Sequence, residues 1–528
     1  MKRLFPTIML SLLFPFCRSV AADTLTVSYT ANQQAELQPA AVEGLKITVK
    51  NGDVKIKDWR TSPKPLFFIL KGKSTDGSFK LNTEAAVTLQ LENLELTSQQ
   101  GAPLHLKNKN IANIIAADGT RNVLTVTACT DTVKQKAAVI WTKNRLRIAG
   151  KGQLNLIAQG DGCKGINCKD SLIIESLTLD VQTLGNNLGV DTTRNFGFGG
   201  PPPSFNLDSI PAEMKAQFEE MRKRFEEMGK DGAFPMMGGP GKGMGFGGMK
   251  PEGGFGTPPM GGGPEGVPGD GPGGGRGGKQ KYLSTCKGIK AKGTLTIQSG
   301  KVSVTTNSRG AEGMEGKQGV TINGGEVAIQ AVDDAINSGG QIIFNGGRTC
   351  AISTNNDAVD SNLGGFDFGG GMPPFMMGDD SSQNRKNEQE PAIVINGGEV
   401  LAWSQNGPPE EGLDCDFAPI QVTGGTILSI GAGMGEMPSV PTNETAQQPT
   451  ALLIGLNIQK GQPVSLYKAN AKGKATGKPL FSYTVPFDFQ RSASIISHAA
   501  LKTGQAYLLK SAGKDYPLKL TEPFTICR

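Results

Sequence analysis

The sequence predicts an all-β protein, a right-handed parallel β-helix with Gly/Pro/Met-rich insertions and a small C-terminal β cap. Three observations predict this fold. A strand–turn–strand pattern recurs along the chain, a short apolar plug stands between its copies, and the plugs return at a regular interval. Plugs that begin at Gly288, Gly313, Ala335 and Ala358 follow one another after 25, 22 and 23 residues. Stacked laps of this length, each with three short strands, are typical of the fold, because one lap cannot bury its apolar side alone.

The strand–turn–strand pattern is clearest in GVTINGGEVAI, residues 319–329. Apolar residues alternate in it with others, which is the pattern of a strand with one buried face. Related segments lie at 294–304, 341–352, 392–403 and 419–430, and Cys350 falls on an inward position, which predicts a buried, inert thiol. The expected inward residues are Val320, Ile322, Val327 and Ile329, and the expected outward ones are Thr321, Ala328 and Gln330.

The chain begins with a segment typical of a secretory signal peptide. Residues 1–22 join a basic start, Lys2-Arg3, to an apolar stretch and a small-residue site at Ala21-Ala22. This order predicts export to the periplasm, the cell surface or the medium. Cys17 leaves a lipid-anchored form open. No later apolar run is long enough to span a membrane, so no transmembrane segment is expected.

The rest of the chain divides by composition. Residues 23–445 carry the laps, and Gly/Pro/Met-rich segments interrupt them at 194–280 and 366–391. Their lack of periodicity predicts flexible insertions. Residues 446–528 contain segments typical of hairpins. We expect them to form the β cap, since an open β-helix end would leave an unpaired strand edge.

The composition excludes several classes of protein. Only 2 histidines occur, which argues against His-based catalytic triads and zinc hydrolases. A net charge of +6 is mild and scattered, and does not favour nucleic acid as a partner. Of the 8 cysteines, all but Cys17 follow the signal peptide, an odd number that leaves a thiol unpaired within the monomer. Cys163 and Cys168 are close enough in sequence to bridge each other, although nothing requires it.

Acidic and amide residues flank the plugs of consecutive laps. Stacking places equivalent residues about 4.8 Å apart, where like charges repel by roughly 1 kcal/mol in water and about 4 kcal/mol near a protein surface. Ca²⁺ binds carboxylate, amide and carbonyl oxygens and would offset this repulsion. The double carboxylates on two consecutive laps, Asp333-Asp334 and Asp357–Asp360, favour a metal site most. The full candidate metal set is Asp333, Asp334, Asn356, Asp357, Asp360, Asn337, Glu315 and Asp414.

A purely structural role of the same residues stays open. Asn and Asp cap β-helix corners, where they bond to main-chain groups and tolerate left-handed turns. Lys290 lies in the same expected column and can act there as an internal counter-ion. The candidate carbohydrate-binding residues are Trp403, Lys290 and Arg309. Trp403 falls on an outward strand position, from which a ring can stack on a sugar; ordinary packing under a loop is the alternative.

Several segments resemble a family of bacterial calcium-dependent carbohydrate-binding β-helix proteins, related in fold to pectate lyases. The resemblance rests on AVDDAINSGG, on TNNDAVDSN, on the lap LRIAGKGQLNLIAQGDGCKGINCKD and on the tail PLFSYTVPFDFQRSASIISHAALKTGQAYLLKSAG, and it covers nearly the whole mature chain. It implies an exported, calcium-dependent protein that binds plant cell-wall polysaccharide, either acidic pectin-type chains or cellulose. The laps CKGIK (286–290) and DGCKGIN (161–167) hold fewer carboxylates, which weakens the case for calcium there.

We therefore expect an exported, calcium-dependent polysaccharide-binding protein without catalytic activity. A polysaccharide lyase is the first alternative, with Ca²⁺ to acidify the proton beside a uronate and a Lys or Arg as base. Its candidate bases are Lys287, Lys290, Arg309 and Lys317. A structural surface or adhesion protein is the second alternative. The sequence does not specify the sugar, the number of ions or the oligomeric state.

Overall fold

A computed structural model of the chain describes residues 23–128, 137–188, 284–363, 390–415, 418–433 and 438–528, all within one compact unit. The predicted signal peptide and the insertion at 194–280 lie outside these residues, as does all but the end of the insertion at 366–391. The described residues form strands and turns and contain no helix, so the prediction of an all-β chain is confirmed for them. They therefore include no helix long and apolar enough to cross a membrane.

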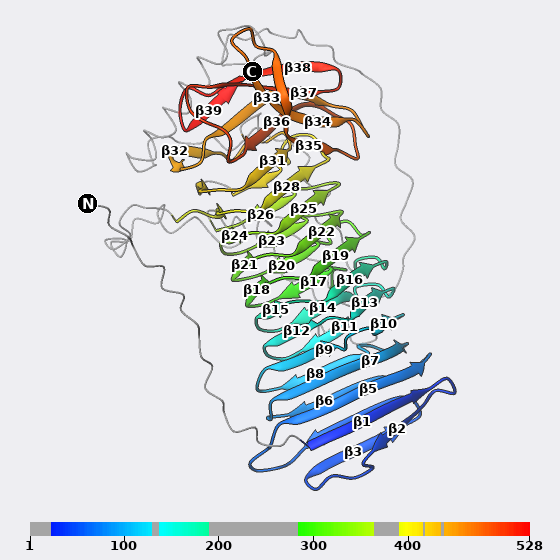
Figure 1. The fold of residues 1–528 in the computed structure, drawn as a ribbon. Coiled ribbons are helices and arrows are strands. Elements are labelled where there is room, and N and C mark those ends of the chain that lie inside the picture. The colour runs from blue at the N-terminus through cyan, green and yellow to red at the C-terminus, as the bar shows by residue number, and fades with distance from the viewer. Residues whose placement is uncertain (1–22, 129–136, 189–283, 364–389, 416–417, 434–437) are drawn as a thin grey trace, which may run out of the picture. The chain divides into compact units, whose positions relative to one another are not determined.

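Most strands stack in parallel, each against the strand at the same place one lap later (Figure 1). A lap holds three short strands, for example β20 (Met314–Gly316), β21 (Gly319–Ile322) and β22 (Glu326–Ala331). The next lap supplies their partners, which are β23 (Ile336–Ser338), β24 (Ile342–Phe344) and β25 (Arg348–Ser353). The predicted lap of three strands is confirmed.

One ladder carries the plugs and forms an 11-stranded sheet, parallel except for its first pair, β3 and β4. Its strands besides β20 and β23 are β3 (Leu45–Lys50), β4 (Asp53–Asp58), β6 (Ser78–Thr83), β8 (Leu104–Asn108), β11 (Ala138–Thr142), β14 (Lys164–Cys168), β17 (Ile289–Ala291), β26 (Val359–Ser361) and β29 (Leu413–Asp414).

Two further ladders belong to a 24-stranded sheet. The ladder of β21 and β24 also holds β9 (Ala112–Ala116), β12 (Leu146–Gly150), β15 (Leu172–Ile174), β18 (Thr294–Ile297), β27 (Ile393–Ile395) and β30 (Ile420–Val422). The ladder of β22 and β25 also holds β10 (Arg121–Val126), β13 (Gln153–Ala158), β16 (Thr178–Thr183), β19 (Lys301–Thr306), β28 (Glu399–Ser404) and β31 (Thr426–Ile430). At the N-terminal end the same sheet continues into β1 (Asp23–Thr30), β2 (Gln34–Gln38), β5 (Leu66–Ser74) and β7 (Val87–Ser98).

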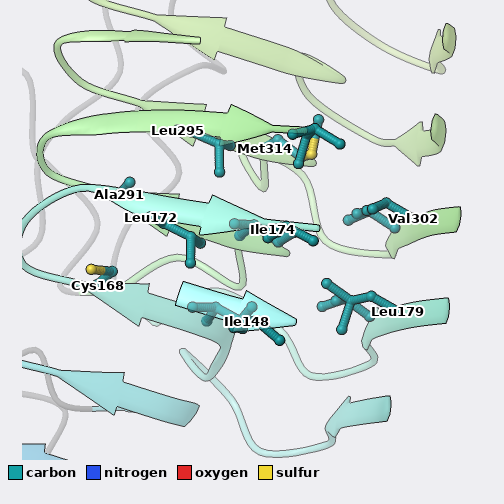
Figure 2. Close-up of a cluster of buried hydrophobic side chains, with 14 of the residues drawn as sticks. Ile148, Cys168, Leu172, Ile174, Leu179, Ala291, Leu295, Val302 and Met314 are labelled. Carbon is teal, nitrogen blue, oxygen red and sulfur yellow. The ribbon is translucent and has the colours of Figure 1, made fainter. Parts of the chain in front are cut away.

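The core lies between the ladders and is aliphatic. Figure 2 shows part of it, where Leu172, Leu295 and Met314 come from different laps and point into one cluster. The four expected inward residues of 319–329 are all buried, and Thr321, Ala328 and Gln330 are more exposed, as predicted. Stacking therefore removes from water a face that a single lap would leave exposed.

The turn between the second and third strands of a lap requires glycine. The last residue of this turn, which is the second glycine of a Gly-Gly pair or the glycine after Ser299, has a positive φ, a conformation that a side chain makes costly. The repeat of this turn on laps with different loop lengths keeps the two ladders in register. The glycines at this place are Gly300, Gly325, Gly347, Gly398 and Gly425, with φ between 75° and 96°.

The C-terminal segment joins the last lap by antiparallel pairing. β36 (Phe489–Ser497) pairs with β31 and with β33 (Thr450–Ile458). A second cluster of buried apolar residues joins this segment to Leu401, Trp403 and Leu428 of the last laps. The remaining strands are β32 (Pro441–Ala446), β34 (Pro463–Ala469), β35 (Ala475–Thr484), β37 (Ala506–Ser511), β38 (Lys514–Lys519) and β39 (Phe524–Cys527), of which β34, β35, β37 and β38 form a separate antiparallel sheet.

The cysteines correct one expectation and exclude one pairing that the sequence left open. Cys350 lies on the outward side of β25 and is half-buried rather than inside the core, because its neighbours Thr349 and Ala351 take the inward positions. Burial raises the pKa of its thiol to about 11, so the expected low reactivity holds for another reason. Cys163 is disulfide-bonded and Cys168 is free, so they do not bridge each other.

Candidate functional site

Two columns of polar side chains flank the buried plugs of the 11-stranded sheet. Positions are counted from the buried apolar residue of each plug, such as Met314 or Ile336. The first column stands two positions before this residue, and the second stands one position after it. Main-chain bonds fix the stacking: Gly288 N donates to Glu312 O at 3.1 Å, and Gly313 N donates to Asp334 O at 2.8 Å. The first column is Lys164, Lys287, Glu312, Asp334, Asp357 and Glu411, and the second is Asn167, Lys290, Glu315, Asn337, Asp360 and Asp414.

A small residue between the first column and the plug lets the laps approach closely. A Cβ added at Gly288 would lie 2.6 Å from the carbonyl oxygen of Gly313 and 2.3 Å from Cγ1 of Val304. Ala335 and Ala358 take this place on later laps. The charged groups of consecutive laps are therefore held at the spacing of neighbouring strands, about 4.8 Å.

The sign of the charge changes along both columns. Lysines stand at one end, at Lys164, Lys287 and Lys290, and carboxylates stand at the other, from Asp334 onward. The glutamates Glu312 and Glu315 lie between them, on one lap. The order predicted for the second column, from Lys290 to Asp414, is confirmed by the strand register.

The acidic end is a cluster of carboxylates bridged by amides. Asn356 Nδ2 donates to Asp333 Oδ1 at 3.0 Å and to Asp334 Oδ1 at 2.7 Å. Asn337 Nδ2 donates to Asp334 Oδ2 at 2.9 Å and to Asp360 Oδ2 at 2.8 Å. The structure thus brings together Asp333, Asp334, Asn337, Asn356 and Asp360 of the predicted metal set. Each bridging amide connects carboxylates without neutralising them.

Burial and mutual repulsion make ionisation of this cluster costly. Asp334 is 4% exposed, and burial followed by its neighbours Asp333, Asp360 and Asp357 raises its pKa well above the usual range. Asp357 is buried too, and burial, Asp414 and Asp360 raise its pKa in the same way. A cation at this place would reverse the effect, because it favours the charged form of every carboxylate around it.

Asp357 lies on the lap of Asn356 and Asp360, and Asp414 lies one lap further along. Asp357 Oδ1 accepts a bond from the main-chain N–H of Glu411. Asp414 Oδ1 accepts one from the Ser439 hydroxyl at 3.1 Å. Glu410, which the sequence analysis did not single out, joins this group: burial, then Asp333 and Asp414, raise its pKa to about 7. Its signal in the sequence was weak, because it precedes the column position by one residue.

Glu315 belongs to a different environment from the rest of the predicted metal set. Its carboxylate is fully buried and lies 2.8 Å from Nζ of Lys287 and 2.6 Å from Nζ of Lys290, and it also pairs with Lys317. Burial alone raises its pKa, but Lys287, Lys290 and Lys317 outweigh burial and hold the pKa well below its usual range. Three lysines already supply the positive charge here, so we leave Glu315 out of the metal site.

The basic end contains a buried amine that the sequence analysis missed. Lys164 Nζ donates to Ser284 Oγ at 3.0 Å and to the carbonyl oxygen of Thr285 at 2.8 Å. Burial, then Lys287 and Lys290, lower its pKa to about 7. The signal was the place of Lys164 two positions before the plug of its lap, but 122 residues separate it from the next lysine of the column at Lys287.

The three predicted carbohydrate-binding residues lie in different environments. Trp403 is 3% exposed and packs in the second apolar cluster, where its Nε1 donates to Leu428 O at 3.1 Å. The expectation of an exposed ring is wrong, because the C-terminal segment covers this outward position. Lys290 is partly exposed but paired with Glu315. Arg309 is exposed in the turn after β19, where its main-chain carbonyl accepts a bond from Asn187.

No three His, Cys, Asp or Glu side chains in the described ranges converge closely enough to hold a metal ion as they stand. The amides of Asn337 and Asn356 occupy the space between the carboxylates. A cation at the acidic end therefore needs the amide oxygens as well as the carboxylates, and a half-turn of an amide exchanges its nitrogen for its oxygen.

Comparison with known proteins gives one family match and one solved structure. A family model described as carbohydrate-binding domain-containing protein matches residues 50–196 and 276–358, which is less than half of the chain and includes Asp333, Asp334 and Asp357. The polysaccharide lyase-like protein from C. thermocellum, solved as a gadolinium derivative, is similar to 76% of this chain over 96% of its own, with 15% identity and a TM-score of 0.38. No curated protein matches the chain.

Proposed function

We propose that this chain is an exported, non-catalytic polysaccharide-binding protein whose stacked laps form a right-handed parallel β-helix. Its proposed ligands are acidic, pectin-type glycans of the plant cell wall, or cellulose, and its proposed cofactor is Ca²⁺. The match of a carbohydrate-binding family model to residues 50–196 and 276–358 supports binding of a polysaccharide. The chemistry of the acidic end supports the cation.

The observation that carries the calcium proposal is the pair of buried carboxylates Asp334 and Asp357. Both have raised pKa values, with burial as the first cause and neighbouring carboxylates as the next. The bonds that reach Asp334 from Asn337 and Asn356 come from neutral amides, which leave its charge in place. Folding the chain with these groups buried is costly at neutral pH unless a cation joins them.

The donor set fits Ca²⁺ better than smaller ions. Asp333, Asp334 and Asp360 offer carboxylate oxygens, and Asn337 and Asn356 offer amide oxygens after a half-turn of each amide. Ca²⁺ accepts six to eight such oxygens in flexible geometry, whereas Mg²⁺ requires a tight octahedron. When bound, Ca²⁺ would supply a positive charge to which a uronate carboxylate of the ligand can also bind. The protein's own residues would hold the cluster together and orient the ligand.

Among the candidate bases predicted from the sequence, Lys287 favours binding over lyase chemistry. A base that removes a proton beside a uronate needs a neutral amine near the working pH. Burial lowers the pKa of Lys287, but Glu312 and Glu315 outweigh burial and raise it. Lys290 and Lys317 both lie against the carboxylate of Glu315. The raised pKa keeps the Lys287 amine protonated, whereas burial and then Lys287 lower the pKa of Lys290, so the case against a base rests on Lys287, and binding without catalysis is the function proposed.

A glycan-binding screen in Ca²⁺ and in a chelator tests the proposal. We expect binding to polygalacturonate that weakens in the chelator and in Asp334→Asn/Asp357→Asn. The matched control, Asp118→Asn/Asp515→Asn, removes two exposed carboxylates elsewhere and should bind like the parent. No binding to any polysaccharide would reject the function in favour of a structural or adhesion role. Steady formation of unsaturated uronate, measured by ultraviolet absorbance, would reject the hypothesis that the protein is non-catalytic.

A further inference from the structure

Five lysines occupy the same position on five consecutive laps of the 11-stranded sheet. Each follows the plug by three positions. From the second lysine onward, each main-chain N–H donates a hydrogen bond to the lap before it. The acceptor is the carbonyl oxygen of the residue that precedes the lysine of that lap, at 2.9–3.0 Å. We call this row the lysine strip. It consists of Lys107, Lys143, Lys169, Lys292 and Lys317.

The strip is a feature of the fold and not of the linear sequence. Lys169 and Lys292 are separated by 122 residues that include the first insertion, yet they are neighbours in the stack. Neighbouring strands place them about 4.8 Å apart at the main chain. The positive charge that looks scattered along the chain is thus gathered into one straight row. All five side chains reach solvent, with Lys169 the least exposed.

The strip differs from the charged row on the ladder of β22 and β25. There, lysine or arginine on one lap faces glutamate on the next, as in Lys301–Glu326 at 3.4 Å and Arg348–Glu399 at 2.6 Å. In the strip, lysine faces lysine. Of its members, Lys317 alone forms an ion pair within the described residues, with Glu315. The strip therefore lacks the alternating charges that pair along that ladder.

The like charges of the strip act on one another. Burial, followed by Lys292 and Lys290, lowers the pKa of Lys169 to about 8. No carboxylate of the described residues pairs with Lys107, Lys143, Lys169 or Lys292 to relieve the repulsion. An external anion laid along the row would relieve it at every lap.

A second row, two residues earlier on the same strands, lies on the same face as the strip. It places His105, Trp141, Asn167 and Lys290 beside successive lysines. The rings of His105 and Trp141 lie 4.5 Å apart. Trp141 is 6% exposed, and its Nε1 donor has no hydrogen-bond partner among the described residues. A buried N–H without an acceptor is rare in native proteins, and this one points to an oxygen atom that those residues do not supply.

We propose that the lysine strip is a second, calcium-independent site that binds a linear polysaccharide with a carboxylate on each sugar ring, laid along the stacking direction. The lysines would take the carboxylates, one at each lap. The indole N–H of Trp141 and the amide of Asn167 would take hydroxyl or ring oxygens beside them. This site deepens the proposed function and rests on it for the ligand class.

The shape of the strip favours a single extended chain over a duplex nucleic acid. Duplex DNA carries one charge per about 1.7 Å of its axis on two winding strands. A protein that binds duplex DNA therefore needs a broad basic surface. The strip is one residue wide and supplies one charge per lap, which suits a flat, extended polymer with one charge per ring.

The test compares two triple variants with the same loss of charge. Lys143→Gln/Lys169→Gln/Lys292→Gln removes the centre of the strip, and Lys472→Gln/Lys474→Gln/Lys478→Gln removes three exposed lysines of the C-terminal segment. The probe is an oligogalacturonate in EDTA at low salt. We expect the strip variant to lose at least about tenfold in association rate, since attraction of an anion by a row of charges contributes that much or more. The control variant and Lys143→Arg/Lys169→Arg/Lys292→Arg should bind like the parent.

The outcomes separate this site from the proposed calcium site. Asp334→Asn/Asp357→Asn should keep its binding in EDTA, so loss of calcium-dependent binding alone leaves the strip standing. Equal binding by the strip variant and the parent would overturn the inference. Equal binding of the fully methyl-esterified oligomer, or duplex DNA bound as tightly and lost in parallel, would overturn the ligand class. If the triple variant has a lowered urea midpoint, the exposed single changes Lys143→Gln and Lys292→Gln decide the result.

Discussion

Lys290 and Glu315 occupy the same position on consecutive laps, and Nζ of Lys290 lies 2.6 Å from Oε2 of Glu315. Glu315 is fully buried, and it also contacts Lys287 at 2.8 Å and pairs with Lys317. This carboxylate therefore stands at the point where the columns change from positive to negative. It separates the lysine-rich laps from the aspartate-rich laps.

Replacement of Glu315 by glutamine should destabilise the protein strongly. The change leaves Lys287 and Lys290 close to each other without the shared carboxylate, and removal of one partner of a buried ion pair costs about 3–5 kcal/mol. Urea unfolding at neutral pH measures the loss. Glu326→Gln is the matched control, because Glu326 pairs with Lys301 on the surface. A surface pair is worth roughly 0–1 kcal/mol, so equal losses in the two variants would contradict this role of Glu315.

In a chelator, the protein should become more stable as the pH falls from neutral toward the ordinary aspartate range. Native Asp334 and Asp357 have raised pKa values, from burial first and neighbouring carboxylates second. They hold protons at a pH where the unfolded chain has lost them, and the state that binds more protons gains stability as the pH falls. The urea midpoint at several pH values in EDTA measures this slope.

The double variant Asp334→Asn/Asp357→Asn should lose most of that slope, because neither side chain can then titrate. Saturating Ca²⁺ should reduce the slope in the parent, since a bound cation favours the charged carboxylates. A parent whose stability rises with pH over the whole range in EDTA would contradict the assigned pKa direction. Glu315, with its lowered pKa, acts oppositely, but only below the ordinary glutamate range.

The sequence predicts the stacked laps and the order of the second column because both depend on short-range spacing. A plug every 22 to 25 residues defines a lap, and the residue after each plug must then stack on its counterpart. Lys290, Glu315, Asn337 and Asp360 follow this rule. The lysine strip follows it too, but Lys169 and Lys292 lie on opposite sides of an insertion, so their relation becomes plain only when the strands are paired.

Two residues depend on contacts that spacing does not encode. Alternation places Trp403 outward, yet β36 and its neighbours pack against the last laps and bury it. Likewise, the position of Glu315 in the column is predictable, whereas its full burial and its ion pair with Lys287 of the previous lap are not. Long-range packing and ion pairing thus decide the fate of both side chains.

Trp403→Ala should lower stability and leave polysaccharide binding unchanged. The ring is buried and its Nε1 donates to Leu428 O at 3.1 Å, so truncation removes both packing and a hydrogen bond. Large-to-small changes of buried aromatic residues cost about 3–5 kcal/mol. Thermal unfolding measures the loss, and binding is compared at a temperature well below both midpoints. Weaker polysaccharide binding by fully folded Trp403→Ala would restore the stacking role expected from the sequence.

Lys164 should make the stability of the protein rise with pH between about 7 and about 10. Burial, then Lys287 and Lys290, lower its pKa to about 7 in the native state, while an unfolded lysine titrates near about 10.4. Over this interval the unfolded chain binds the extra proton, so unfolding takes up a proton and stability increases as the pH rises.

Lys164→Met tests this relation, because methionine fills similar space and does not titrate. The variant loses the bonds to Ser284 Oγ and Thr285 O at every pH, so its absolute stability is not the readout. The readout is the urea midpoint of the variant minus that of the parent. This difference should be larger at about pH 6 than at about pH 10. Lys472→Met, on an exposed lysine of the C-terminal segment, should show no such trend. A difference that stays constant across the range would mean that Lys164 keeps its proton when buried.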